Sequence, residues 1–232
     1  MSNLKELTWE HHKNAERQEF VKELMSGKIT KERYATLLFN LHPQYNILET
    51  FARMYDLVDV RQAPRIHADY HELWDETQQF QPEVLPVVKE YMDHIMSIQQ
   101  DPDKLMAHLY VRHMGDLSGG QMIAKKVPGS GLMYQFDEDV NTLKEKIRAR
   151  LDDSMADEAK ICFDAVVKSC NRDPTTSTTS AALASKFAAE VPVTPTAPTL
   201  IGSFQLMALL PACVSDTGIP NVSEKVLRVS AA

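Results

Sequence analysis

Apolar residues recur at intervals of three and four positions through residues 1–172 of this 232-residue chain, with polar residues between them. This spacing gathers apolar side chains on one face of a helix, and the alternating runs typical of strands are absent. Helical segments are predicted at residues 3–25, 30–57, 66–80, 83–98, 101–127, 139–151 and 155–169. Since helices with one apolar face must bury it against one another, the predicted fold class is an all-α, single-domain multi-helix bundle.

Local signals mark several ends of these segments. Gly27 suits the end of the first helix, and Thr30 suits the cap of the second. Asp101 followed by Pro102 predicts the start of the fifth, because Asp caps well and Pro is tolerated at the first helical position. The sequence TLKE at residues 142–145 has the pattern of a capping box and predicts that Thr142 caps a helix.

The composition changes near Arg172. Residues 173–232 contain six of the chain's twelve prolines and few charges, which predicts a Pro/Thr/Ala-rich flexible tail after a helical domain at 1–172. Residues 200–214 are apolar, but Gln205 and Pro211 interrupt them. Because a spanning helix needs about 20 apolar residues, no stable membrane span is expected there.

Three glycines interrupt the segment at 101–127. Each of Gly115, Gly119 and Gly120 costs a helix roughly 1 kcal/mol relative to alanine. Gly115 and Gly119 are four apart and share a face. A face without side chains allows close approach of another helix or of a flat ligand, and adjacent glycines also permit a bend.

The sequence around these glycines, YVRHMGDLSGGQ at residues 110–121, closely resembles the distal helix of heme oxygenases. HHKNAERQEF at 11–20 resembles the proximal helix of that family. YNILE at 45–49 and LKEKIRAR at 143–150 occur in the same order as their counterparts. The resemblance covers residues 1 to about 172, and it implies a helical bundle that holds heme between the proximal and distal helices.

The resemblance implies an iron ligand on the proximal helix. His12 keeps the family spacing to the residues that follow, so it is the expected ligand of heme iron. Glu16, one turn further on, is expected to accept the imidazole N–H and fix which nitrogen faces the metal. His11 is the competing candidate.

The resemblance also assigns residues to the heme edge and to the distal side. Lys5, Lys144, Arg148 and Tyr110 match positions that bind the heme propionates. On the distal side, Asp116 is expected to hold water beside bound dioxygen, and Arg112 and Tyr45 to belong to the same hydrogen-bond network. The glycines, with Gly115 and Gly119 on one face, are expected to press bare backbone against the porphyrin. His113 stands where some relatives have tyrosine.

The implied activity is that of an enzyme, a heme-degrading oxidoreductase. Heme b, both cofactor and substrate, would be cleaved with dioxygen to the alpha isomer of biliverdin, carbon monoxide and ferrous iron. Ferredoxin is the expected electron donor, a flavin reductase is the alternative, and a downstream bilin reductase would take the product. Two other functions stay open: a non-enzymatic heme-binding or heme-storage protein, and a thiamine-salvage enzyme of similar architecture with a catalytic cysteine.

Net charge and cysteine content limit the classes of binding partner and the cellular compartment that we expect. The net charge of −7 argues against nucleic acid, whose phosphates require an excess of Lys and Arg. The three cysteines show no CxxC spacing, and the first residues contain no apolar signal segment. These features predict free thiols, a reducing compartment and a cytoplasmic location.

Two further pairs of residues have the spacing of metal ligands on a helix. His67 and His71 are four apart, as are Glu90 and His94. No additional ligand completes a zinc set by sequence spacing, and the paired E-x-x-H motifs of a ferritin-like di-iron site are absent. Both pairs are therefore interpreted as solvated helix faces.

Overall fold

A computed structural model of the protein describes residues 2–57, 60–74 and 82–170. Its regular elements are all helical, as predicted. The α-helices are α1 (Leu4–Leu7), α2 (Trp9–Glu16), α3 (Glu19–Ser26), α4 (Lys31–Met54), α5 (Ala63–Leu73), α6 (Pro86–Ser97), α7 (Pro102–Gly115), α8 (Gln121–Ile123), α9 (Val140–Arg148) and α10 (Ala156–Cys170). The predicted tail and its apolar stretch lie outside the described residues.

The amino-terminal segment is divided into three helices, so the prediction of one helix at 3–25 is wrong. Thr8 ends α1, and its hydroxyl donates a 2.8 Å hydrogen bond to the Leu4 carbonyl. Gln18 is extended, with φ −62° and ψ 138°, and separates α2 from α3. Gly27 ends α3 with φ 72°, a left-handed conformation that glycine adopts at little cost, as predicted.

The predicted caps are confirmed in two of three places. The side chains of Thr30 and Asp101 accept hydrogen bonds from backbone N–H groups three residues on. The capping box at residues 142–145 is wrong. Asp139 caps α9 instead, and its carboxylate accepts from the backbone N–H of Thr142.

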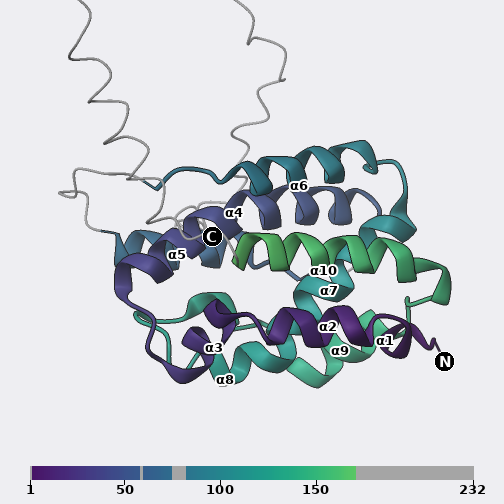
Figure 1. Ribbon diagram of the computed structural model, residues 1–232. Helices are drawn as coiled ribbons and strands as arrows, with labels where there is room; N and C mark the ends of the chain where they lie inside the picture. The colour runs from purple at the N-terminus through teal and green to yellow at the C-terminus, as the bar shows by residue number, and fades with distance from the viewer. Residues whose placement is uncertain (1, 58–59, 75–81, 171–232) are drawn as a thin grey trace, which may run out of the picture. The chain divides into compact units, whose positions relative to one another are not determined.

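The helices pack around two clusters of buried side chains. One cluster lies mainly among α4, α6, α7, α9 and α10, and the other lies mainly between α4 and α5 and includes residues 127, 133 and 134. Helix α10 packs against α7, α6 and α2, and in Figure 1 it lies below α6 and above α2, with α7 behind it. None of the described helices combines the length and the apolarity needed to span a bilayer.

The helix predicted at 101–127 changes geometry at its glycines. Helix α7 ends at Gly115, residues Asp116–Gly120 form a π-helical turn, and α8 follows directly. The prediction of one regular α-helix is therefore wrong. A π-turn widens the helix by one residue, and such turns occur often at functional sites. The turn is where the predicted distal residues lie.

Candidate functional site

The glycines of the π-turn have two different surroundings. A Cβ atom added at Gly115 or Gly119 would meet no heavy atom within 4 Å, so open space lies beside both. A Cβ at Gly120 would lie 2.5 Å from Cδ1 of Tyr134. Gly120 is required for packing against this ring, and it does not belong to the open face. Gly115 and Gly119, the two that were expected to share a face, are the ones that border open space.

Asp116 begins the π-turn and is held from the opposite helix. The Tyr45 hydroxyl of α4 donates a 2.7 Å hydrogen bond to Oδ2 of Asp116. Burial raises the pKa of the Asp116 carboxyl to about 7, although the Tyr45 hydrogen bond and the charge of Arg112 act to lower it. A carboxyl group with this pKa exchanges its proton readily near neutral pH.

Arg112 is buried behind Asp116, one turn earlier on α7. Its guanidinium lies 4.6 Å from the ring centroid of Tyr91 and 5.9 Å from that of Tyr45. It donates a hydrogen bond to Oε1 of Gln44, whose Nε2 in turn donates to the carbonyl of Asn40. The sequence analysis missed Gln44, which precedes Tyr45 on the buried side of α4 and orients the guanidinium.

His113 is completely buried beside this network. Its ring packs edge-on against Tyr45, with centroids 5.6 Å apart, and its Nε2 lies 3.8 Å from Oε1 of Glu49. Burial, with the nearby charge of Arg112, lowers the pKa of His113 to about 3. His113 is therefore neutral, and it supports the Tyr45 ring from within the core.

His12 lies on α2 between two aromatic rings. It stacks on Trp9 at 5.6 Å and meets the edge of Phe163 at 5.8 Å between centroids. Its Nδ1 is 3.7 Å from Oε2 of Glu16 and has no hydrogen-bond partner among the described residues. Glu16 is thus on the expected side of the ring, at ion-pair distance but beyond hydrogen-bond distance. Nδ1 faces Glu16, which leaves Nε2 for a ligand.

His11, the competing candidate, is engaged elsewhere. Its Nδ1 is 3.0 Å from Oδ1 of Asp164 on α10. The two adjacent histidines therefore differ in their surroundings: His11 is tied to α10 through Asp164, whereas His12 lies between Trp9 and Phe163.

Comparisons with known proteins identify the family. A sequence profile of heme oxygenases matches residues 1–172. The chain belongs to the heme oxygenase family. Heme oxygenase 2 of Macaca fascicularis is 33% identical over 170 residues, which cover 64% of this chain and 54% of that one. Heme oxygenase 2 of Synechocystis is 30% identical over 177 residues, 66% of this chain and 71% of the relative. The chain spans about half the length of its mammalian relatives.

Solved structures of heme oxygenases share the fold. The Synechocystis heme oxygenase-1 structure in complex with heme matches with a TM-score of 0.66 at 22% identity, covering 80% of this chain and 97% of that one. The heme oxygenase of Leptospira interrogans matches with a TM-score of 0.60 at 28% identity, covering 71% and 95% respectively. These matches confirm the all-α heme oxygenase fold.

The positively charged residues expected from the family lie on two separate helices. Lys5 of α1 has its Nζ 5.9 Å from the Trp9 ring, next to His12. Lys144 and Arg148 lie on α9, which buries Leu143 and Ile147 and packs against α7 and the π-turn. Within the described ranges, none of these three cations has an acidic ion-pair partner.

Tyr110 is half-buried on α7, before the π-turn. Burial raises the pKa of its hydroxyl, and Thr8 acts in the opposite direction. Thr8 stands between α1 and α2, so Tyr110 faces the junction of the two helices that carry Lys5 and His12.

The two residue pairs with metal-ligand spacing, His67 with His71 and Glu90 with His94, have different surroundings. His67 and His71 are exposed, as predicted, with their Nε2 atoms 3.0 Å apart. His94 is not on a solvated face. It contacts Glu158 of α10 rather than Glu90 of its own helix, because the bundle places α6 against α10. This contact joins residues 64 positions apart, which no spacing rule within one helix detects.

Proposed function

We propose that this protein binds heme and cleaves it oxidatively to biliverdin, carbon monoxide and ferrous iron, with dioxygen and an external reductant. The observation that carries the proposal is the bare backbone at Gly115 and Gly119 directly beside Asp116, a half-buried carboxyl whose pKa is raised to about 7. A heme-storage protein needs the space but has no use for a proton-exchanging carboxyl at its edge.

The residues present fit heme. His12 offers Nε2 to the iron, since its buried Nδ1 faces Glu16. Gly115 and Gly119 leave the room that a flat ring requires. Lys5, Lys144 and Arg148, with the Tyr110 hydroxyl, would bind the two propionates; the absence of acidic partners for the three cations in the part of the chain described here leaves their charge available.

When bound, heme supplies the iron that activates dioxygen, and it is also the molecule that is oxidised. Asp116 then holds and moves protons. Tyr45 occupies Oδ2, which leaves Oδ1 to hold a water molecule or exchange a proton with it. Arg112, oriented by Gln44, supplies the positive charge that keeps the pKa of Asp116 from rising further. The alpha isomer is the product that the resemblance to the family implies.

The proposed electron donor is a ferredoxin. Lys5, Lys144 and Arg148 would border the heme edge, and an acidic ferredoxin would complement their charge. A flavin reductase is the alternative donor, and a bilin reductase would consume the product. Turnover with ferredoxin should therefore fall as ionic strength rises, because screening weakens attraction between exposed charges.

One experiment tests the function. The full chain is mixed with heme, and absorption spectra are followed after adding ascorbate or ferredoxin and oxygen. The expected result is a ligated heme spectrum that gives way to biliverdin absorption, with one isomer after chromatography. The variant Asp116→Ala should bind heme as well as the unaltered protein and form little biliverdin.

The alternatives predict different results. A heme-storage protein would keep its heme spectrum unchanged under reductant and oxygen. A thiamine-salvage enzyme would show no ligated heme spectrum. The buried position of Cys162 already argues against a nucleophilic role for that thiol, because substrate cannot reach it.

A further inference from the structure

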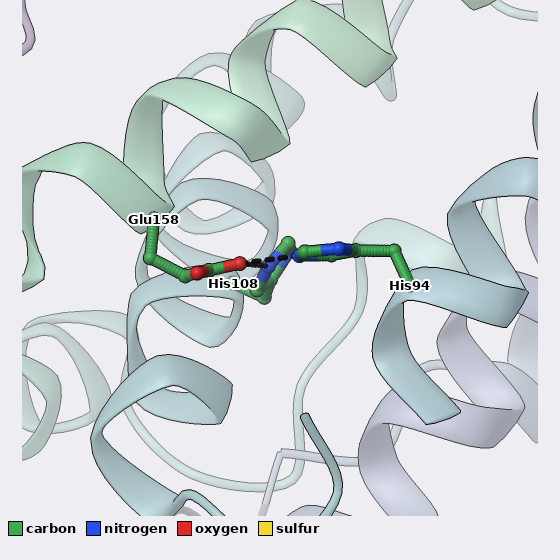
Figure 2. Close-up of side chains that lie close together, drawn as sticks. All are labelled: His94, His108 and Glu158. Carbon is green, nitrogen blue, oxygen red and sulfur yellow. Dashed lines mark hydrogen bonds and ion pairs between the residues drawn. The ribbon is translucent and has the colours of Figure 1, made fainter. Parts of the chain in front are cut away.

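Three side chains from three helices meet inside the bundle (Figure 2). His94 of α6 has its Nε2 2.5 Å from Oε1 of Glu158 on α10, and His108 of α7 has its Nε2 2.9 Å from the same oxygen. The possible ligand atoms of the three residues all lie within 4.8 Å of one another. Two imidazoles and a carboxylate thus point toward one small volume.

This cluster lies at the edge of the core and not in its centre. The His108 side chain is 0% exposed and that of Glu158 is 9% exposed, whereas the His94 side chain is 29% exposed. His94 can therefore move aside without disturbing the packing. An ion entering from its side would meet two ligands that are already fixed.

The second nitrogen of His108 is held by a partner. Nδ1 of His108 is 3.0 Å from the hydroxyl of Tyr91. In the metal-free cluster Nε2–H donates to the Glu158 carboxylate, so an entering ion must displace this proton. With Nδ1–H donating to the Tyr91 hydroxyl oxygen, Nε2 would then carry the lone pair that a metal requires. Histidines that bind metals are almost always oriented through the other ring nitrogen in this way.

Two hollows give access to the cluster. A cavity of about 260 Å³ has His94 in its wall together with the carboxylates Glu90 and Asp164. Another, of about 380 Å³, has Glu158 in its wall beside Asp101, Asp103 and Asp157. Each wall contains a single lysine, so carboxylates predominate in both. Such surroundings raise the local concentration of cations.

We propose that His94, His108 and Glu158 form a binding site for a divalent transition-metal ion of the zinc type, independent of the proposed heme site. Two imidazole nitrogens and one carboxylate oxygen are a ligand set that zinc accepts, and they leave a coordination position for water. Tetrahedral bonds of about 2.1 Å place neighbouring ligand atoms about 3.4 Å apart, so Oε1 of Glu158 must separate from Nε2 of His94 by about 0.9 Å and from Nε2 of His108 by about 0.5 Å. The partly exposed His94 supplies the larger of these movements.

The consequence of occupancy follows from the positions of the three helices. The ion would join α6, α7 and α10, of which α7 leads into the π-turn and α10 carries Phe163 against His12. A ligand that binds only the folded state stabilises it by mass action. The site is therefore proposed as a structural one that braces the helices behind the candidate heme site.

The test uses the full chain, free of heme and stripped of metal, in a His67→Ala/His71→Ala background. This background removes an exposed histidine pair that would itself chelate metal. Co²⁺ is the probe because its visible ligand-field bands report coordination, and Zn²⁺ is the competitor. We expect one tightly bound Co²⁺ per chain with the intense bands of low coordination number, displaced by one Zn²⁺, and no cobalt–thiolate charge-transfer band.

Variants then locate the ion. Tyr91→Phe removes a residue that only orients His108, and it should weaken Co²⁺ binding by about tenfold. His94→Ala removes a direct ligand, and it should weaken binding by more than about 100-fold. Glu158→Gln preserves the shape of the cluster but removes the anionic ligand, and it should also abolish tight binding. Glu90→Gln is the matched control: it removes a carboxylate from the adjacent cavity and should leave affinity nearly unchanged.

Thermal unfolding separates a metal site from a purely hydrogen-bonded cluster. Zn²⁺ should raise the unfolding temperature of the background protein in a concentration-dependent way, and this rise should vanish in Glu158→Gln if circular dichroism shows an intact helical fold. The proposal is overturned if the background protein binds no Co²⁺ even when Co²⁺ is in large excess. It is equally overturned if His94→Ala and Glu158→Gln retain the bands and the affinity.

Discussion

The Tyr45 hydroxyl and Oδ2 of Asp116 are joined by a 2.7 Å hydrogen bond that connects α4 to the π-turn. The two residues are 71 positions apart in the sequence. Burial raises the pKa of Asp116 to about 7, and the hydrogen bond opposes this rise because it stabilises the charged carboxylate. The ionisation of Asp116 therefore depends on Tyr45.

Removing the Tyr45 hydroxyl should raise the pKa of Asp116 above 7. In Tyr45→Phe the buried carboxylate loses a donor, while the surroundings that disfavour its charge remain. The measurement is a pH titration of the Asp116 carboxyl carbon by NMR in the heme-free protein. Tyr110→Phe, which removes a more distant half-buried hydroxyl, is the control. An unchanged or lower value in Tyr45→Phe would contradict the interpretation.

Replacing Gly119 or Gly120 by alanine should have different effects on the free energy of unfolding. Gly120→Ala places a methyl group 2.5 Å from Tyr134 Cδ1, so it should lower the free energy of unfolding by about 1–3 kcal/mol, as overpacking does. Gly119→Ala meets open space and should leave that free energy unchanged or higher, because alanine favours helix. Urea unfolding measures both.

Heme affinity tests whether the open space beside Gly119 serves the ligand. Gly119→Ala should bind heme more weakly than the unaltered protein in a spectroscopic titration, since the methyl group enters the proposed heme space. If Gly119→Ala binds heme normally, the open face does not serve the ligand.

Neighbouring histidines should also differ. His12→Ala should alter the Soret band and the ligand-field bands of added heme, and exogenous imidazole should restore them. His11→Ala should leave the bands in place, because His12 is the proposed iron ligand and His11 contacts Asp164 of α10. The reverse pattern would transfer the iron ligand to His11.

The stability of the fold should fall as pH rises toward neutrality. Glu49 is buried and accepts backbone hydrogen bonds from Gln62 and Ala63, and burial raises its pKa from 4.5 to about 7. At Glu49 the folded state therefore binds more protons than the unfolded state between pH 4.5 and about 7, so the contribution of this carboxyl to the free energy of unfolding declines across that window. The difference between the two pKa values corresponds to about 3 kcal/mol at most.

Glu49→Gln provides the matching measurement. This variant cannot ionise, so its free energy of unfolding should decline less between pH 5 and pH 8 than that of the unaltered protein. Both proteins keep the other titrating groups: Asp116 and His108, whose pKa values are raised, act with the same sign as Glu49, and His113, whose pKa is lowered, acts with the opposite sign. Urea unfolding at pH 5 and pH 8 measures this decline in both proteins. If the free energy of unfolding declines equally in the two, the pKa of Glu49 is not raised in the fold.

Local chemistry made several features readable in the sequence. Apolar periodicity predicted helices, and Gly27, Thr30 and Asp101 end or begin them as expected because each acts through its own backbone or its nearest turn. The resemblance to heme oxygenases, carried by four ordered segments, predicted the family and the fold. These inferences needed no knowledge of long-range contacts.

Tertiary packing determined the features that the sequence did not predict. The break at Gln18, the π-turn and the separate role of Gly120 depend on neighbours such as Tyr134, which periodicity cannot place. The pairing of His94 and His108 with Glu158 likewise requires three helices to meet. The chain's order of residues thus specifies helices and their ends through short-range forces. The ionisation of Asp116, the open face of its glycines and the three-residue cluster arise only when burial brings distant groups together.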